Sequence, residues 1–188
     1  MKWIDTTYRS NAPEMMDDFA MEGEILRDAL DKIAKINQLL GGNKVTLDGV
    51  KFLLDGKPKQ SQIRILDVGC GNGDMLRALA DYAIKNGLNF SLIGVDANNF
   101  TIQHAKRLSI NYPNISFECK DIFEDLTTPC DIMLCTLTLH HFKDEEIIHL
   151  LSNIKRQATV GIVINDLHRS ALAYNLFRAL CFIFNLNA

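Results

Sequence analysis

A short glycine-rich stretch, Ile65–Leu76 (ILDVGCGNGDML), contains the residues of this sequence best suited to hold a ligand. Gly69 and Gly71 can adopt positive φ and carry no Cβ that would block a ligand, and Gly73 allows the following helix to pack closely. The N–H groups at the start of that helix can hold an anionic group. The stretch therefore predicts a binding turn between a buried strand and a helix.

The spacing of the glycines separates this turn from the dinucleotide fingerprint. The glycines follow the pattern G-x-G-x-G, whereas a turn that binds a pyrophosphate uses G-x-G-x-x-G. The acid ahead of them, Asp67, suits a cationic amino group better than a phosphate. A ligand that carries an ammonium, a carboxylate and a ribose fits both features. The alternative is a turn without a ligand, because a lone glycine triplet is a weak signal.

Two further carboxylates follow predicted strands. Asp96 ends the run LIGVD roughly 20 residues beyond the glycines, which is the distance of the ribose-binding acid in a βαβ unit. Asp121 can accept the amino group of an adenine, while Ile122 and Phe123 flank the ring. Open parallel sheets bind their ligands at the carboxyl ends of their strands. These side chains are therefore predicted to meet at one edge of a sheet.

Histidines also stand near predicted strand ends, and histidine suits general-base chemistry because its pKa lies near neutrality. His140 and His141 follow the fourth predicted strand, and His168 follows the fifth. Each is a candidate to contact a bound substrate or to take a proton from it. The alternative is structural, because His140 and His141 would also pack the turn before a helix and His168 would cap the last helix.

The elements that must position these residues alternate between strands and helices. Apolar runs predict strands at 63–68, 90–95, 115–119, 130–136 and 160–164. Amphipathic runs predict helices at 74–86, 100–111, 144–156 and 170–184. This alternation predicts an α/β fold with right-handed crossovers, in which a mostly parallel sheet of about five strands has helices on both faces.

The first part of the chain differs in style. Residues 1–60 are predicted to form a helical lid, and residues 61–188 the α/β domain. Apolar residues recur at helical spacing over 14–40, which predicts one long helix or two short ones, and 45–54 predicts a further amphipathic piece. The side chains expected to reach over a ligand are Tyr8, Arg9, Met16 and Phe19.

Composition places the chain among ordinary globular proteins. Its 188 residues carry a formal net charge of −3, so no nucleic-acid partner is expected. The five cysteines form no C-x-x-C pair, which predicts free thiols in a reducing compartment, and their spacing offers no metal site. No segment is typical of a signal peptide or a membrane span, and the expected location is cytoplasmic.

Four blocks of sequence, in order, resemble the motifs of the class I S-adenosylmethionine-dependent methyltransferases. They are the glycine-rich stretch, the ribose block LIGVDAN, the adenine block CKDIFED and the fourth-strand block DIMLCTLTLHHF. The resemblance implies a Rossmann-like fold with S-adenosylmethionine as cofactor. Within the family the chain looks nearest to the small-molecule methyltransferases that modify quinones and polyketides.

The resemblance also implies a role for each matching residue. The methionine part of the cofactor would be surrounded by Asp67, Gly69, Cys70, Gly71 and Gly73. The ribose and the adenine would contact Asp96, Ala97, Asn98, Asp121 and Ile122. The sulfonium would face Cys135, Thr136 and Leu137.

The expected reaction is methylation, on oxygen or carbon, of a small, hydrophobic, hydroxylated acceptor. The family sheet normally closes with a β-hairpin, which this sequence lacks before Ala188. The strand at 160–164 is then expected to have an unpaired edge that a homodimer would cover. One alternative is therefore a truncated, catalytically inactive module that binds S-adenosylmethionine. The other is a nicotinamide-dependent oxidoreductase with an irregular glycine loop.

Overall fold

The computed structural model describes residues 18–57, 61–123, 129–168 and 170–171. Its strands, in chain order, are β1 (Gln62–Val68), β2 (Asn89–Asp96), β3 (Ile115–Cys119), β4 (Cys130–Thr136) and β5 (Ala158–Asn165). Its helices are α1 (Glu24–Leu40), α2 (Gly42–Leu54), α3 (Asp74–Asn86), α4 (Asn99–Leu108) and α5 (Asp144–Gln157), with a 3₁₀ turn, η2, at Leu139–His141.

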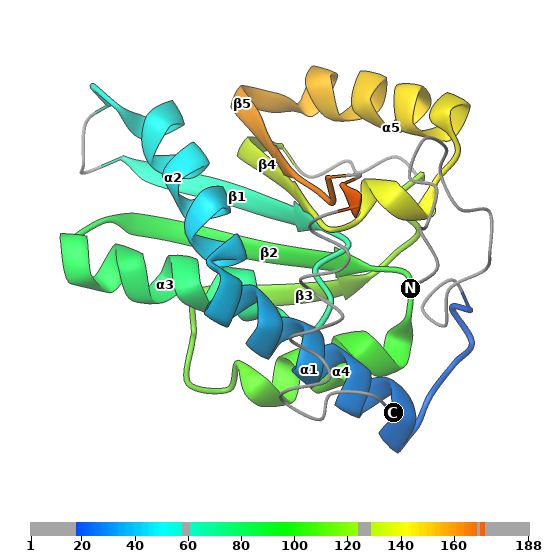
Figure 1. Ribbon diagram of the computed structural model, residues 1–188. Coiled ribbons are helices and arrows are strands. Elements are labelled where there is room, and N and C mark those ends of the chain that lie inside the picture. The colour runs from blue at the N-terminus through cyan, green and yellow to red at the C-terminus, as the bar shows by residue number, and fades with distance from the viewer. Residues whose placement is uncertain (1–17, 58–60, 124–128, 169, 172–188) are drawn as a thin grey trace.

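The strands form one sheet in the order β3-β2-β1-β4-β5, and each neighbouring pair is parallel. Helices cover both faces of this sheet (Figure 1). The order reverses beside β1, so β1 lies at the centre with β2 and β4 on its two sides. The predicted α/β, Rossmann-like class of fold is confirmed, and the carboxyl ends of β1, β2 and β4 come to lie side by side.

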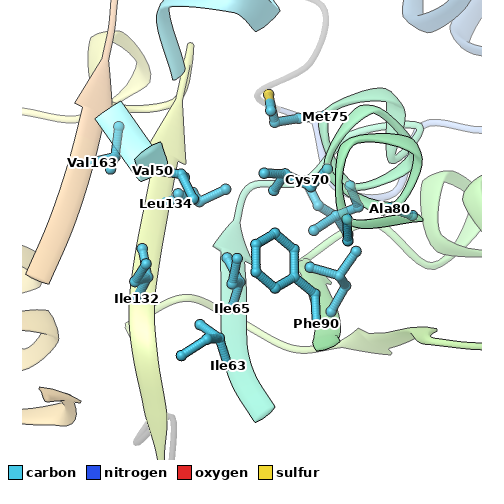
Figure 2. Close-up of a cluster of buried hydrophobic side chains, with 14 of the residues drawn as sticks. Val50, Ile63, Ile65, Cys70, Met75, Ala80, Phe90, Ile132, Leu134 and Val163 are labelled. Atoms are coloured by element: carbon cyan, nitrogen blue, oxygen red, sulfur yellow. The ribbon is translucent and has the colours of Figure 1, made fainter. Parts of the chain in front are cut away.

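Successive side chains of β1 point to opposite faces of the sheet, which explains why the core has two layers. Ile63 and Ile65 face helices α2, α3 and α4 in one buried cluster, part of which Figure 2 shows between the sheet and α3. Leu66 and Val68 point to the opposite face, where they pack with Leu150 and other buried side chains of α5. Burial of each such side chain contributes roughly 1.5–3 kcal/mol, so both faces of the sheet hold it rigid beneath the loops.

Helix α1 begins later than the periodicity of 14–40 predicts. Residues 18–23 are not helical, and α1 starts at Glu24. Asp18 accepts a hydrogen bond from the backbone N–H of Ala20 at 2.9 Å, which stabilises a local turn instead of a helical turn. Gly23, with φ of 94°, then directs the chain into α1. Residues 14–17 of the predicted helix lie outside the described residues.

The end of α4 also differs from the prediction. Helix α4 ends at Leu108, short of the predicted 111, because Ser109 and Tyr112 close a turn through a backbone hydrogen bond of 2.9 Å. The predicted helix at 170–184 lies outside the described residues except for its first two positions. None of the helices in the described part of the chain has the length and hydropathy of a membrane span.

Candidate functional site

A cavity of about 320 Å³ lies at the carboxyl edge of the sheet. Its lining comes mostly from the loops that follow β1 to β4, and these residues are Gly69, Gly71, Asp96, Ala97, Asn98, Asp121, Ile122, Phe123, Leu137, Thr138, His141 and Phe142. The remaining lining residues, from the segment before α1, from α1 and from α4, are Asp18, Phe19, Leu26 and Thr101. A cavity of this size at such an edge is the usual form of a small-molecule site.

The glycine turn forms the floor of this cavity. The backbone N–H groups of Gly69 and Cys70 both donate to the carbonyl oxygen of Val95, at 2.8 Å and 3.0 Å, which ties the turn to β2. Gly69 has φ of 72°, and a Cβ built there would lie 2.5 Å from Oγ1 of Thr138. Glycine is therefore required at this position by both backbone conformation and space.

Asp96 ends β2 beside the turn. Its Oδ2 accepts the N–H of Gly71 at 3.1 Å, and its Oδ1 accepts the N–H of Asn98 at 3.0 Å. Burial raises the pKa of this carboxyl, although the two backbone hydrogen bonds act in the opposite direction. A carboxylate has about four acceptor sites, so lone pairs remain for the hydroxyls of a ligand in the cavity.

Asp67 lies beneath the turn instead of in the cavity wall. The residue is 2% exposed, and within the described part of the chain its Oδ1 has no hydrogen-bond partner. Burial raises its pKa well above the ordinary value, and the charges of Asp74 and Asp96 act in the same direction. A buried carboxyl group without a donor is one that an incoming ammonium would satisfy, because the positive charge would favour its ionised form.

The end of β3 supplies an aromatic wall. Asp121 is exposed at the cavity and accepts the N–H of Phe123 at 2.9 Å, and Ile122 is buried behind it. The ring of Phe123 lies edge-on to that of Phe142, with centroids 5.0 Å apart, and stacks near His149. This wall is suited to a flat, apolar group such as a heteroaromatic base.

The structure separates the residues of the fourth-strand block. Leu137 lines the cavity with φ of 53° and donates its N–H to Asn165 at 2.8 Å. Cys135 is fully buried in the core, where burial raises the pKa of its thiol to about 12. Thr136 is directed to α2, with its hydroxyl 3.3 Å from that of Thr46. Backbone strain at a bulky residue such as Leu137 is typical of functional sites.

The candidate histidines occupy different environments. His141 lines the cavity, and the ring of His140 lies behind it with centroids 4.2 Å apart. His140 contacts Asp166 twice, through Nδ1 to Oδ1 at 2.6 Å and through its backbone N–H to Oδ2 at 3.2 Å. Burial raises the pKa of Asp166, but hydrogen bonds from His140 and Leu167 prevail and lower it. His168 is exposed and does not line the cavity.

Several lining residues were not singled out from the sequence. Leu26, Thr101, Thr138 and Phe142 reach the cavity only through tertiary packing, and no local spacing marks them. Asp18 also lines the cavity, from the segment before α1. Of the residues expected to reach over a ligand, Phe19 lines the cavity, whereas Tyr8, Arg9 and Met16 lie outside the described residues. Cys70 and Gly73 lie in the turn but outside the cavity lining.

Comparisons with known proteins agree with this geometry. The model of a family described as a methyltransferase domain matches residues 59–181. The ubiquinone biosynthesis O-methyltransferase of Coxiella burnetii is 32% identical over 136 residues, which cover 69% of this chain and 53% of that protein. The chain thus spans about half the length of this curated relative.

Solved structures share the fold. The DszA carbon methyltransferase has a TM-score of 0.63 at 19% identity, covering 76% of this chain and 40% of that one. The plantazolicin methyltransferase BpumL, solved with a pentazolic desmethylPZN analog and SAH, has a TM-score of 0.61 at 23% identity, covering 80% of this chain and 56% of that one. At these identities the similarity establishes the arrangement of strands and helices.

Proposed function

The chain belongs to the class I S-adenosylmethionine-dependent methyltransferases, and on this premise we propose that it methylates a small, hydrophobic, hydroxylated acceptor. The observation that carries the proposal is the set of carboxylates at successive strand ends, Asp67, Asp96 and Asp121, around one glycine turn. Similarity to a ubiquinone biosynthesis O-methyltransferase supports a hydroxylated aromatic acceptor and transfer to oxygen, with carbon as the second candidate.

In this proposal each part of the cofactor has its own partners. Asp96 accepts the ribose hydroxyls, while Asp121, Ile122 and Phe123 hold the adenine. The methionine ammonium satisfies the Oδ1 of Asp67 that has no donor within the described residues. Asp67 lies below the turn, so Gly69 and Gly71 must let the ligand approach the backbone closely. Leu137, which lines the cavity, faces the sulfonium in this proposal.

The cofactor supplies an electrophilic methyl group, so the work of the protein is to position the acceptor, exclude water and remove a proton. Phe142 and Leu137 give that end of the cavity an apolar wall. His141 faces the cavity and takes the proton of the acceptor hydroxyl, while the pair of His140 and Asp166 fixes the turn that carries it. We assign this role to His141 instead of His168, because His168 is exposed away from the cavity lining.

Residues before the α/β domain complete the site in this proposal. Phe19 and Leu26 line the cavity from the segment that precedes α1 and from α1 itself. Residues 1–60 therefore act as a cover over the cofactor, and residues 61–188 as the domain that binds it. A homodimer that covers β5, an outer strand of the described sheet, is a further part of the proposal.

The test has two stages with the purified full chain. Calorimetry and thermal shift with S-adenosylmethionine, S-adenosylhomocysteine and NADH should detect binding of the first two and not the third. Incubation of the protein with S-adenosylmethionine and a panel of catechols and alkyl-substituted hydroxyquinones should then release S-adenosylhomocysteine and give a methylated product by mass spectrometry. Binding without turnover of any panel member would favour the inactive module, and binding of NADH alone would favour the oxidoreductase.

A further inference from the structure

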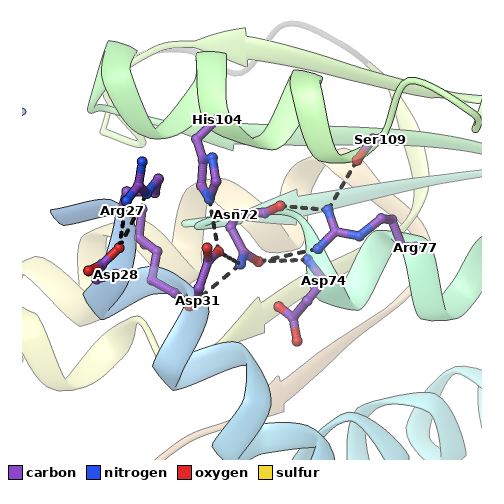
Figure 3. Close-up of polar contacts among 9 residues, drawn as sticks. Arg27, Asp28, Asp31, Asn72, Asp74, Arg77, His104 and Ser109 are labelled. Carbon is purple, nitrogen blue, oxygen red and sulfur yellow. Dashed lines mark hydrogen bonds and ion pairs between the residues drawn. The ribbon is translucent and has the colours of Figure 1, made fainter. Parts of the chain in front are cut away.

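Asp31 on α1 connects three segments that are far apart in the sequence. Its Oδ1 lies 2.8 Å from Nε2 of His104 on α4 and accepts a hydrogen bond of 3.0 Å from Nδ2 of Asn72 in the glycine turn. Figure 3 shows the His104 ring approaching this carboxylate from α4 and the Asn72 side chain approaching it from the glycine turn. His104 and Asn72 are 5% and 4% exposed, so both donors are buried and held by their surroundings.

Asn72 in turn holds the shape of the glycine turn. Its Oδ1 accepts the backbone N–H of Asp74 at 3.2 Å, at the first residue of α3. Its backbone oxygen accepts a bond of 2.7 Å from Arg77, whose guanidinium also donates to Ser109 beyond the end of α4 at 3.1 Å. The residue between Gly71 and Gly73 is therefore tied to α1, α3 and the end of α4 at once.

Helix α1 also packs directly on the turn and the cavity. Leu30, adjacent to Asp31, lies within contact distance of the turn, because a Cβ built at Gly71 would be 3.8 Å from its Cδ2. Leu26, about one helical turn earlier, is 2% exposed and lines the cavity. A movement of α1 would thus change the cover of the cavity and the support of the turn together.

The charge on Asp31 strengthens this connection. Burial raises the pKa of this carboxyl, but the hydrogen bonds from His104 and Asn72 prevail and lower it. A carboxylate that accepts hydrogen bonds from two buried donors is held more strongly than a neutral acceptor. Asp28, on the same helix, is different, because its carboxylate is 58% exposed and pairs with Arg27 on the surface.

We propose that Asp31 is a positioning residue whose hydrogen bonds, here called the latch, hold α1 against the glycine turn and α4. The cover and the turn then open and close together. The consequence for ligand exchange rests on the proposed cofactor site. The structural part does not, because the contacts of Asp31 join protein side chains alone. The latch predicts that breaking it loosens residues 69–73, which lie in a different part of the sequence from α1.

The first experiment measures amide hydrogen exchange of the full chain without cofactor. Asp31→Ala should speed exchange in peptides that cover 24–40 and 69–73 about tenfold, whereas Asp28→Ala should leave 69–73 unchanged. Asp31→Asn keeps an oxygen that can accept both hydrogen bonds and should restore most of the protection. Equal exchange of 69–73 in wild type and Asp31→Ala would overturn the latch.

The second experiment measures dissociation of S-adenosylhomocysteine by stopped flow. Asp31→Ala should release this ligand about tenfold faster than wild type, with a smaller change in the association rate, and Asp28→Ala should match wild type. His104→Gln, which keeps an N–H donor, should lie between them and serves if Asp31→Ala fails to fold. Identical dissociation in all four proteins would contradict the latch. Absence of binding to wild type would instead overturn the cofactor proposal, and hydrogen exchange would still decide the latch.

Discussion

The backbone N–H of Gly71 donates to Oδ2 of Asp96 over 3.1 Å, so the turn after β1 and the end of β2 form one unit. Gly71 reaches this geometry with φ of 52°, in the left-handed region. The other carboxylate oxygen accepts the N–H of Asn98, the residue that caps α4. Asp96 therefore shapes the turn as well as facing the cavity, and both contributions are lost when its side chain is removed.

Asp96→Ala should weaken the binding of S-adenosylhomocysteine at least about 100-fold. Two hydrogen bonds from ribose hydroxyls to a charged acceptor, worth roughly 1.5–3 kcal/mol each, account for such a loss. Asp96→Asn keeps one acceptor oxygen and should fall between wild type and the alanine variant. Titration calorimetry measures all three affinities.

The matched control for this prediction is Glu118→Ala. Glu118 lies on the neighbouring strand β3, pairs with Lys120 at 2.7 Å and does not line the cavity. Its removal should leave the affinity within about twofold of wild type. Unchanged affinity in Asp96→Ala would remove the ribose role from this carboxylate.

Much of the fold was predictable because the apolar runs of the strands and the helical spacing of apolar residues are both clear in this sequence. The strands at 115–119 and 130–136 have the predicted bounds, and α3 matches the predicted 74–86. Boundaries that depend on a single local hydrogen bond were not predictable. The turn at Asp18 replaces a helical turn that hydrophobic periodicity alone favoured, because periodicity reports burial and not the competition of a side chain for the backbone.

The candidate site divides in the same way. Asp96 and Asp121 could be placed at the cavity because parallel strands end at a common edge. Thr138 and Phe142 could not, since their positions depend on how the loop after β4 folds back over the turn. The partner of His140 is a similar case, because Asp166 lies beyond a full helix and strand and no spacing marks the pair.

Asp67→Asn should stabilise the cofactor-free protein at neutral and higher pH. The folded state raises the pKa of Asp67, so it holds the proton more tightly than the unfolded chain does. The free energy of unfolding therefore falls as the pH rises above the ordinary carboxyl value of about 3.9, until the pH passes the folded value. The variant lacks this loss. Its free energy of unfolding should therefore exceed that of wild type by about 1 kcal/mol or more near pH 8.

Urea unfolding at several pH values measures this difference. The stability gap between the variant and wild type should close near about pH 4 and widen as the pH rises, until the pH passes the folded pKa of Asp67. The same variant should bind S-adenosylhomocysteine more weakly, since a neutral amide is a poorer partner for the ammonium. A gap that is constant with pH would show that Asp67 is ionised already in the cofactor-free fold.

Asp166→Ala should lower methyl transfer about 10–100-fold while leaving cofactor affinity within about twofold, a loss typical of impaired acid–base catalysis. The substitution removes the acceptor of both His140 bonds, so the turn that carries His141 loses its support. Glu145→Ala, an exposed acid at the start of α5, is the control and should retain full activity. Release of S-adenosylhomocysteine with an acceptor from the panel measures the rate. Parallel losses of affinity and rate would indicate a general effect on folding instead.

Gly69→Ala should destabilise the fold by about 2–5 kcal/mol, from an alanine in the left-handed region and from a Cβ forced into a packed neighbour. The Cβ would lie 2.5 Å from Oγ1 and 2.6 Å from Cγ2 of Thr138, and φ at this position is 72°. Thr138→Ala in the same chain removes both of those atoms but not the backbone strain. The double variant should therefore recover part of the loss, although Thr138 also gives up its hydrogen bond to the carbonyl of Val68 or of Thr136. Thermal unfolding of the two single variants and the double variant gives the coupling energy directly. A coupling of zero would mean that the cost at Gly69 comes from φ alone, and the steric explanation would then be wrong.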